Sequence, residues 1–290
     1  MPSMRLIEDV ESKKRKFTAP GKKPNNFDRR FDQTQLKSTS HGYTVHRDYA
    51  AHFFRWGFVF KTIDYQKTRV LDLGCGQECP LARVLSFRMA AVPGFWVGVD
   101  LNKIPKPFKS AWAVVKDDFS FIDRHVELVD EYGAESFDLV TCFEMIEHMH
   151  PEDGVKLLQN AADLTAPDGR MYLSTPVYNG KKMAANHLHE YKIDELEQLI
   201  VGTGRWEVER RFGTFASWNE IKKVMTKNER ELYEELNQYY DHEVLSCFLS
   251  PKYPDASRNN VWVLKKIDGD VVRTSGMKRP VKTVDVKGGF

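Results

Sequence analysis

An acidic residue and two glycines, Asp72, Gly74 and Gly76, follow an apolar run within a few positions. Glycine tolerates a positive φ and, because it lacks a Cβ, lets the backbone approach a bound molecule closely. The pattern predicts a buried parallel strand that ends in a tight turn facing a ligand. A dinucleotide-binding turn would need a third glycine, which Gln77 to Pro80 do not provide. Glu78 would also repel a pyrophosphate, so the turn disfavours a diphosphate.

A second apolar run, Phe95 to Val99, ends in Asp100. Its distance from the turn is a little over the ~20 residues at which nucleoside-binding sheets carry a carboxylate for the ribose hydroxyls. At the end of the first strand, Asp72 can meet a cationic amino group, directly or through water. The two acids therefore predict a ligand that is nucleoside-like, cationic and free of phosphate. S-adenosylmethionine (SAM) has these properties.

Two further apolar runs end in polar residues that we assign to the same ligand. After Ala113 to Lys116 come two carboxylates for an adenine amino group and a phenyl ring to cover the adenine face. After Phe137 to Phe143 the chain runs into Glu144. The residues predicted to contact the cofactor are Asp72, Gly74, Gly76, Asp100, Leu101, Asp117, Asp118, Phe119, Phe143 and Glu144.

In this order, the motifs resemble class I SAM-dependent methyltransferases, with a core similar to that of ubiquinone-type O-methyltransferases. The resemblance covers Arg69 to Arg211 and Val261 to Lys266, and includes the turn Pro167 to Gly169 into a fifth strand. It implies a doubly wound, Rossmann-like α/β fold whose seven-stranded sheet is mostly parallel with an antiparallel last strand. It also implies an enzyme that transfers a methyl group to oxygen or nitrogen of an unidentified acceptor, either a small molecule or a nucleic acid.

Transfer to a hydroxyl or an ammonium group requires a base, and histidine is the natural base near neutral pH. His148 follows the fourth predicted strand, and His187 and His189 follow the fifth. All three can reach the region where a methyl group would be offered. We take His148 and His187 as the catalytic candidates, with packing of the pocket wall as the alternative role.

The pattern Glu144-x-x-Glu147-His148 with a later Asn186-His187 also resembles the metal site of small-RNA 3′-terminal 2′-O-methyltransferases. That resemblance implies an RNA acceptor and an Mg²⁺ or Mn²⁺ ion. The same pattern occurs in metal-free ubiquinone-type O-methyltransferases, so a metal-free site is favoured. Under the alternative, the metal ligands are Glu144, Glu147, His148 and His187.

A third hypothesis is a cofactor-binding or nucleic-acid-binding protein that has the fold without turnover. The complete set of Asp72, Gly74, Gly76 and Asp100 argues against this hypothesis. Fold alone does not determine the acceptor, however.

Helices must position these strand ends. Apolar residues at helical spacing from Tyr49 to Phe60 predict a helix ahead of the first strand. Ser217 and Thr226 each begin a capping-box pattern, which predicts two helices between the sixth and seventh strands. This insertion, residues 214–256, is a candidate cap over the sheet edge where ligands bind in doubly wound folds. A packing role is the alternative.

Length and charge predict the domain layout. With 290 residues and 41% hydrophobic residues, the chain is long enough for one large α/β domain with appendages. We predict a methyltransferase domain over residues 41–267, flanked by basic tails, 1–40 and 268–290. The charges of Lys13 to Lys16 and of Lys278 and Arg279 fit a solvated tail or, alternatively, phosphate contacts with nucleic acid.

Compartment follows from what the sequence lacks. No run of about 18 apolar residues suits a membrane span, and the charged N-terminal segment does not resemble a secretory signal. The four cysteines, Cys75, Cys79, Cys142 and Cys247, form no paired metal motif and are expected as small buried hydrophobes or free thiols. These features predict a cytoplasmic protein without membrane contact.

Overall fold

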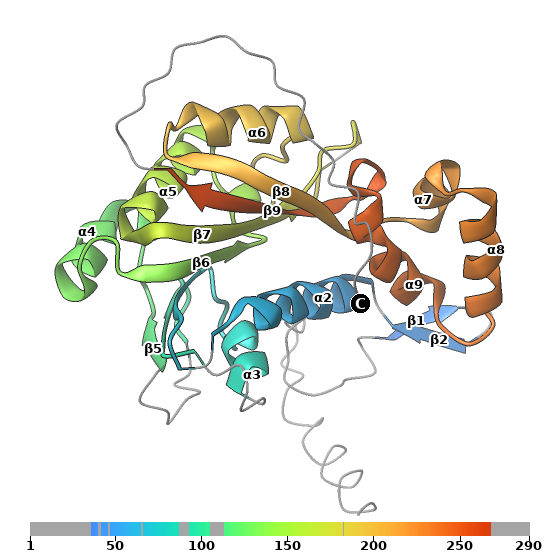
Figure 1. The fold of residues 1–290 in the computed structure, drawn as a ribbon, viewed down its shortest axis with the longest axis horizontal. Helices are drawn as coiled ribbons and strands as arrows, with labels where there is room; N and C mark the ends of the chain where they lie inside the picture. The colour runs from blue at the N-terminus through green and yellow to red at the C-terminus, as the bar shows by residue number, and fades with distance from the viewer. Residues whose placement is uncertain are drawn as a thin grey trace, which may run out of the picture.

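The computed structural model describes residues 36–39, 42–45, 47–64, 66–86, 93–104, 113–181 and 183–267. Its centre is a seven-stranded sheet with the order β5-β4-β3-β6-β7-β9-β8 (Figure 1). The strands are β3 (Arg69–Leu73), β4 (Phe95–Val99), β5 (Ala113–Lys116), β6 (Phe137–Phe143), β7 (Thr165–Pro176), β8 (Trp206–Phe215) and β9 (Asn259–Lys266).

Strand direction decides where the strand ends gather. The pairs β3–β4, β4–β5, β3–β6 and β6–β7 are parallel, whereas β9 is antiparallel to both β7 and β8. This is the predicted fold. The carboxyl ends of the parallel strands therefore share one edge, and β9 begins there, because its first residue, Asn259, pairs with Pro176 at the end of β7. We call this edge the carboxyl edge.

Two layers of helices cover the sheet (Figure 1). Helices α2 (Arg47–Thr62) and α3 (Pro80–Ser86) pack on one face, where Trp56, Val59 and Leu81 meet sheet residues in a buried cluster. Helices α4 (Phe121–Tyr132), α5 (Pro151–Leu164) and α6 (Ile193–Gly202) pack on the other face, and side chains such as Leu157 form the larger core there. The helix predicted ahead of the first strand is α2.

The insertion between β8 and β9 contains three α-helices where two were predicted. These are α7 (Trp218–Val224), α8 (Lys227–Leu236) and α9 (His242–Leu249), followed by the 3-10 turns η4 (Ser250–Lys252) and η5 (Pro254–Ala256). The Thr226 capping box forms as predicted, whereas the Ser217 side chain makes no cap hydrogen bond. Helix α9 was missed because its N-cap, Asp241, bonds the Glu243 amide without the capping-box spacing.

Helix α8 and the turn after it expose several apolar side chains and bury one aromatic ring. Leu232 is 53% exposed and Tyr239 is 75% exposed, whereas Tyr233 is buried and stacks on Trp218. The insertion packs on α2 through a small cluster that contains Ala50, Ala51, Phe215 and Cys247. It therefore borders the carboxyl edge at its α2 side.

The predicted tails lie outside the described residues except for one segment. Strand β1 (Leu36–Thr39) pairs with β2 (Gly42–Val45), so the predicted boundary at residue 41 falls within an antiparallel pair. All four cysteines are buried thiols that form no disulfide, as predicted. Among the described helices, none has both the length and the apolar character that a membrane span requires.

Candidate functional site

The turn after β3 adopts the backbone conformation that its glycines predict. Gly74 has a φ of +67° and Gly76 a φ of +71°, in the left-handed region that side chains disfavour. The amides of Gly74 and Cys75 donate to the carbonyl of Val99, at 2.8 and 3.1 Å, which fastens the turn to the end of β4. A Cβ on Gly74 would lie 3.0 Å from the Met145 sulfur. The turn is therefore closely packed at Gly74.

Asp100 holds the same turn from the neighbouring strand. Its Oδ2 atom accepts a hydrogen bond from the Gly76 amide at 2.9 Å, and Oδ1 accepts from the amide and side chain of Asn102, at 2.7 and 2.9 Å. A carboxylate offers about four acceptor positions, and three are used here, so one position on Oδ2 remains for a ribose hydroxyl and a second would require Asn102 to give up a contact. Beside it, Leu101 is 65% exposed, which leaves an apolar surface at the end of β4.

Asp72 lies at the point where the strand order reverses. It pairs in register with Thr141 of β6, whose Oγ1 donates to Asp72 Oδ1 at 2.7 Å. Burial raises the pKa of Asp72 to about 7; the Thr141 hydrogen bond opposes this and the Asp100 charge adds to it. A buried carboxylate with such a pKa gains most from a cation bound beside it.

The end of β5 differs from the prediction in one residue. Asp117 and Asp118 are exposed at the carboxyl edge, and Asp118 has a φ of +56°. Phe119 is buried in the main core, with the Arg124 guanidinium 4.5 Å from its ring centre, and its amide donates to the Asp100 carbonyl. The turn at Asp118 directs the phenyl ring into the core, so this ring offers no open face to an adenine.

Glu144, directly after β6, joins three elements. Its Oε1 accepts from Arg55 of α2 and from Ser174 of β7, both at 2.8 Å, and its Oε2 accepts from Asn259 of β9 at 2.7 Å. The Arg55 guanidinium also lies 5.8 Å from the centre of the half-buried Phe143 ring. Glu144 has a φ of +53°, and such uncommon backbone conformations cluster at functional sites.

The two candidate histidines meet at the carboxyl edge. The centres of the His148 and His187 rings are 5.0 Å apart, and the rings are nearly perpendicular. Among the described residues, Glu147, His148 and His187 each place one possible ligand atom within 4.8 Å of the others. Glu144 is not part of this cluster.

One nitrogen of each histidine already has a partner. His148 Nδ1 lies 2.8 Å from the Asn186 carbonyl oxygen, and His187 Nδ1 lies 2.7 Å from a Glu190 carboxylate oxygen. A carbonyl oxygen only accepts, so His148 Nδ1 carries the proton. Nε2 of His148 is then the nitrogen that remains available as a base or a metal ligand.

Two buried carboxyl groups behind the histidines have pKa values that are shifted in opposite directions. Burial raises the pKa of Glu147 well above its ordinary value, the nearby Glu144 raises it further, and Thr175 donates to it at 3.0 Å. Burial alone would raise the pKa of Glu190 as well, but hydrogen bonds from His187 and Arg258 outweigh burial and lower it. Glu190 is therefore held ionised.

His189, the third histidine, is directed elsewhere: its Nε2 lies 2.6 Å from Glu195 Oε1 near the start of α6. The sequence analysis missed several residues that hold the site together. They are Arg55, Thr141, Ser174, Thr175, Glu190, Arg258 and Asn259. Most are ordinary polar residues without a motif. Only Glu190 had a signal, because it belongs to the charged string His187 to Tyr191.

Comparison with known proteins identifies the family of this chain. Residues 25–241 match a family model described as a methyltransferase domain, which is more than half of the chain. The chain belongs to this methyltransferase family. The predicted family is thereby confirmed.

Curated relatives match less than half of the chain. A ubiquinone biosynthesis O-methyltransferase of Xanthomonas oryzae pv. oryzae is 34% identical over 124 residues, which is 42% of this chain and 48% of the relative. One from Vibrio cholerae is 32% identical over 108 residues, 37% of this chain and 41% of the relative. The methyltransferase-family chain thus spans about half the length of the curated relatives it matches.

Among solved structures, the cyclase SpnF has a TM-score of 0.50 at 12% identity, covering 77% of this chain and 82% of that one. A SAM-dependent methyltransferase from Archaeoglobus fulgidus has a TM-score of 0.48 at 15% identity, covering 76% and 94%. At such identities the SpnF match shows the fold alone. A cyclase with this fold illustrates that activity must be argued from the site.

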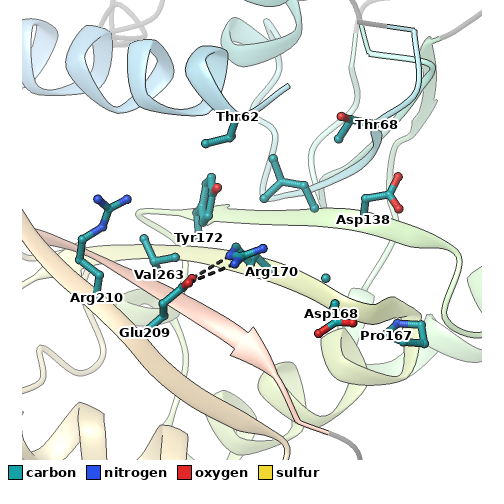
Figure 2. Close-up of a pocket in the computed structure, with 12 residues that line it drawn as sticks. Thr62, Thr68, Asp138, Pro167, Asp168, Arg170, Tyr172, Glu209, Arg210 and Val263 are labelled. Atoms are coloured by element: carbon teal, nitrogen blue, oxygen red, sulfur yellow. Dashed lines mark hydrogen bonds and ion pairs between the residues drawn. The ribbon is translucent and has the colours of Figure 1, made fainter. Parts of the chain in front are cut away.

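A separate groove of about 620 Å³ lies at the opposite edge of the sheet (Figure 2). Asp138 near the start of β6 and Asp168 near the start of β7 line it, and Arg170 and Glu209 bridge it with two hydrogen bonds of 2.7 and 3.0 Å. The groove is thus remote in the sheet from the strand ends that carry His148. It is not the site described above.

Proposed function

We propose that this methyltransferase-family protein transfers a methyl group from SAM to an oxygen or nitrogen atom of an acceptor bound at the carboxyl edge. One observation carries the proposal: the glycine turn with Asp72 and Asp100 lies at the same sheet edge as the His148–His187 pair. Ligands of doubly wound sheets bind at this edge, near the reversal of strand order.

The residues of the first strands fit SAM. Asp72 is a buried carboxylate whose raised pKa favours a cationic partner, and the amino group of SAM would supply one. Asp100 would accept hydrogen bonds from the ribose, and the Gly74–Gly76 turn would let the methionine part approach the backbone. The bound cofactor supplies an activated methyl group, so the protein mainly orients the acceptor and moves its proton.

The residues after β6 and β7 fit the task of taking a proton from the acceptor. When the Nδ1–H group of a neutral imidazole donates a hydrogen bond to the protein, Nε2 keeps its lone pair. That lone pair can accept a proton from a hydroxyl or ammonium group of the methyl acceptor. His148 and His187 are the two candidates. The curated relatives are O-methyltransferases by name, which supports oxygen as the first acceptor atom to test.

A metal-assisted version is the second candidate function. It is favoured by the close approach of Glu147, His148 and His187 and by the fact that both Nδ1 atoms are held by oxygen atoms. Metal-bound histidines commonly donate their other nitrogen in this way. A bound Mg²⁺ or Mn²⁺ would act as a Lewis acid on an acceptor hydroxyl, as in an RNA 2′-O-methyltransferase. Glu144 would have to leave its three protein partners to join these ligands.

A labelled-methyl transfer screen tests the proposal. Purified protein with labelled SAM would be offered small-molecule extracts, RNA, DNA and protein, with and without a chelator. Label in any acceptor supports methyl transfer, and loss of that label on chelation supports the metal-assisted version. Tight SAM binding without label in any fraction would contradict turnover and favour a cofactor-binding protein.

A further inference from the structure

His187 is held by a buried carboxylate, Glu190, which is paired with Arg258 and is not part of the predicted catalytic set. Its Nδ1 lies 2.7 Å from Glu190 Oε1, and the other oxygen of Glu190 accepts from Arg258 Nη2 at 2.6 Å. The Glu190 side chain is 1% exposed, so both oxygens are enclosed by protein. The three groups form a chain from the core of the site to the segment just before β9.

This chain has a chemical consequence for the imidazole. A carboxylate paired with Arg258 remains an acceptor, so the neutral His187 ring is most stable with its proton on Nδ1. Nε2 then carries the lone pair. The same geometry fixes the ring plane, because the donor must point at Oε1. An acceptor on one nitrogen of histidine thus sets what the other nitrogen can do.

A second histidine–glutamate pair on the same loop provides a contrast. His189 Nε2 lies 2.6 Å from Glu195 Oε1, but these side chains are 32% and 42% exposed. Glu195 also accepts from the Lys192 amide at the start of α6, which is a helix-capping role. The two pairs have similar distances, but of the two only the His187 pair contains a fully buried carboxylate and adjoins His148.

We propose that Glu190 is a positioning residue, which holds His187 in the Nδ1-protonated form so that Nε2 faces the bound acceptor with its lone pair. The proposal rests on the proposed methyl transfer and deepens it. Arg258 assists by keeping the carboxylate in place, since it also donates to the Val177 carbonyl just after β7. Arg258 lies two residues after the helical insertion, so it connects the end of that insertion to Glu190 and, through it, to the imidazole.

A purely structural role is the competing explanation. Val177 and Arg258 also share a backbone hydrogen bond of 2.7 Å, so Glu190 could serve only to fasten the loop after β7. In that case its removal would lower the melting temperature and leave turnover of bound substrate intact. Rate and ring tautomer therefore have to be measured separately from stability.

The activity test compares Glu190→Gln and Glu190→Ala with the control Glu195→Gln. Glutamine keeps the shape but can present either its oxygen or its amino group to Nδ1, so it no longer enforces the tautomer. We expect kcat to fall by about 10- to 100-fold in both Glu190 variants, as for other residues that orient a functional histidine, with KM for SAM within about threefold of wild type. The control should lose less than threefold. Unchanged kcat in both Glu190 variants, or an equal loss in the control, overturns the proposal.

Nitrogen–proton NMR of the histidine rings tests the tautomer without any acceptor. The His187 signals are assigned by their absence in His187→Gln. We expect wild type to carry the ring proton on Nδ1, with a gain of the Nε2-protonated form in Glu190→Gln; a proton on Nε2 in wild type overturns the proposal. This wild-type measurement can overturn the proposal even where a Glu190 variant fails to fold. A wild-type protein with the expected tautomer but no methyl transfer would instead show that the proposed function had failed.

Discussion

The two halves of the carboxyl edge are built in different ways. The half at β3, β4 and β5, here called the first half, is built around a turn and is held mainly by backbone amides. The amide of Gly76 bonds to Asp100, which is only 24 positions away in the sequence. The half at β6, β7 and β9, called the second half, consists of side chains from remote segments. Glu144 and Asn259 are 115 positions apart, and Arg258 and Glu190 are 68 apart.

This difference suggests a division of roles between cofactor binding and methyl transfer. A rigid backbone turn suits a ligand that is always the same, and side chains on loops can be exchanged to suit different acceptors. We therefore expect the first half to determine cofactor affinity and the second half to determine the rate of transfer. The predictions below test that division, beginning with the largest expected effect.

Replacing either histidine should affect the rate and spare cofactor binding. We expect His148→Asn or His187→Asn to lower turnover at saturating SAM by ~10²–10⁴, the usual contribution of a positioned general base. The matched control is His189→Asn, because His189 pairs with Glu195 away from the cluster. Measurement is by methyl transfer with and without chelator. Wild-type turnover in both variants would exclude the base and metal roles together.

Removing the Asp100 carboxylate should weaken cofactor binding and spare the rate of transfer. Asp100→Ala loses the acceptor of the Gly76 amide and the predicted ribose contacts, each worth ~1.5–3 kcal/mol for a charged partner. We expect SAM affinity to fall at least tenfold by calorimetric titration, and Asp100→Asn, which keeps an acceptor oxygen, to lose less. A variant with normal affinity but slow turnover would break the proposed division.

Cofactor affinity should also depend on pH through Asp72. Its pKa is raised to about 7, so the fold retains the carboxyl proton at pH values where the unfolded chain has lost it. Its contribution to stability is thus greatest in acid and declines as pH rises towards about 7. Cationic SAM requires the ionised form, so we expect affinity to increase by up to about tenfold per unit below pH 7 and then to level off. An identical pH profile in Asp72→Asn would assign this dependence to another group.

The smallest expected effects concern the turn itself. Gly74→Ala introduces a Cβ at a φ of +67° and 3.0 Å from the Met145 sulfur, so we expect a loss of about 2 kcal/mol in the free energy of unfolding. Gly76→Ala has a similar φ, but its nearest neighbour is Pro80 at 3.9 Å, so strain alone should cost about 1 kcal/mol. Thermal or urea unfolding measures both. Equal losses would mean that the Met145 contact relaxes without cost.

The strand ends were predictable because each depends on a pattern of a few neighbouring residues. Apolar runs that end in Asp72 or Asp100 are buried strands in the structure, and the glycines have the positive φ that a tight turn requires. The role predicted for Phe119 depended on the direction of its side chain, not only on its place in the sequence. The positive φ at Asp118, a residue without the glycine signal, turned the ring into the core.

The sequence by itself determined the fold class, the family and the order of residues along the carboxyl edge. Periodicity and glycine placement act over a few residues, so they can be read without knowing what lies nearby in space. Only the tertiary structure decided which side chains meet: that Glu144 bonds Arg55 and Asn259 rather than the histidines, and that Glu190 holds His187. Such contacts join elements that the sheet brings together after long excursions of the chain. Hydrogen bonds depend on sub-ångström geometry, which only the packed fold supplies.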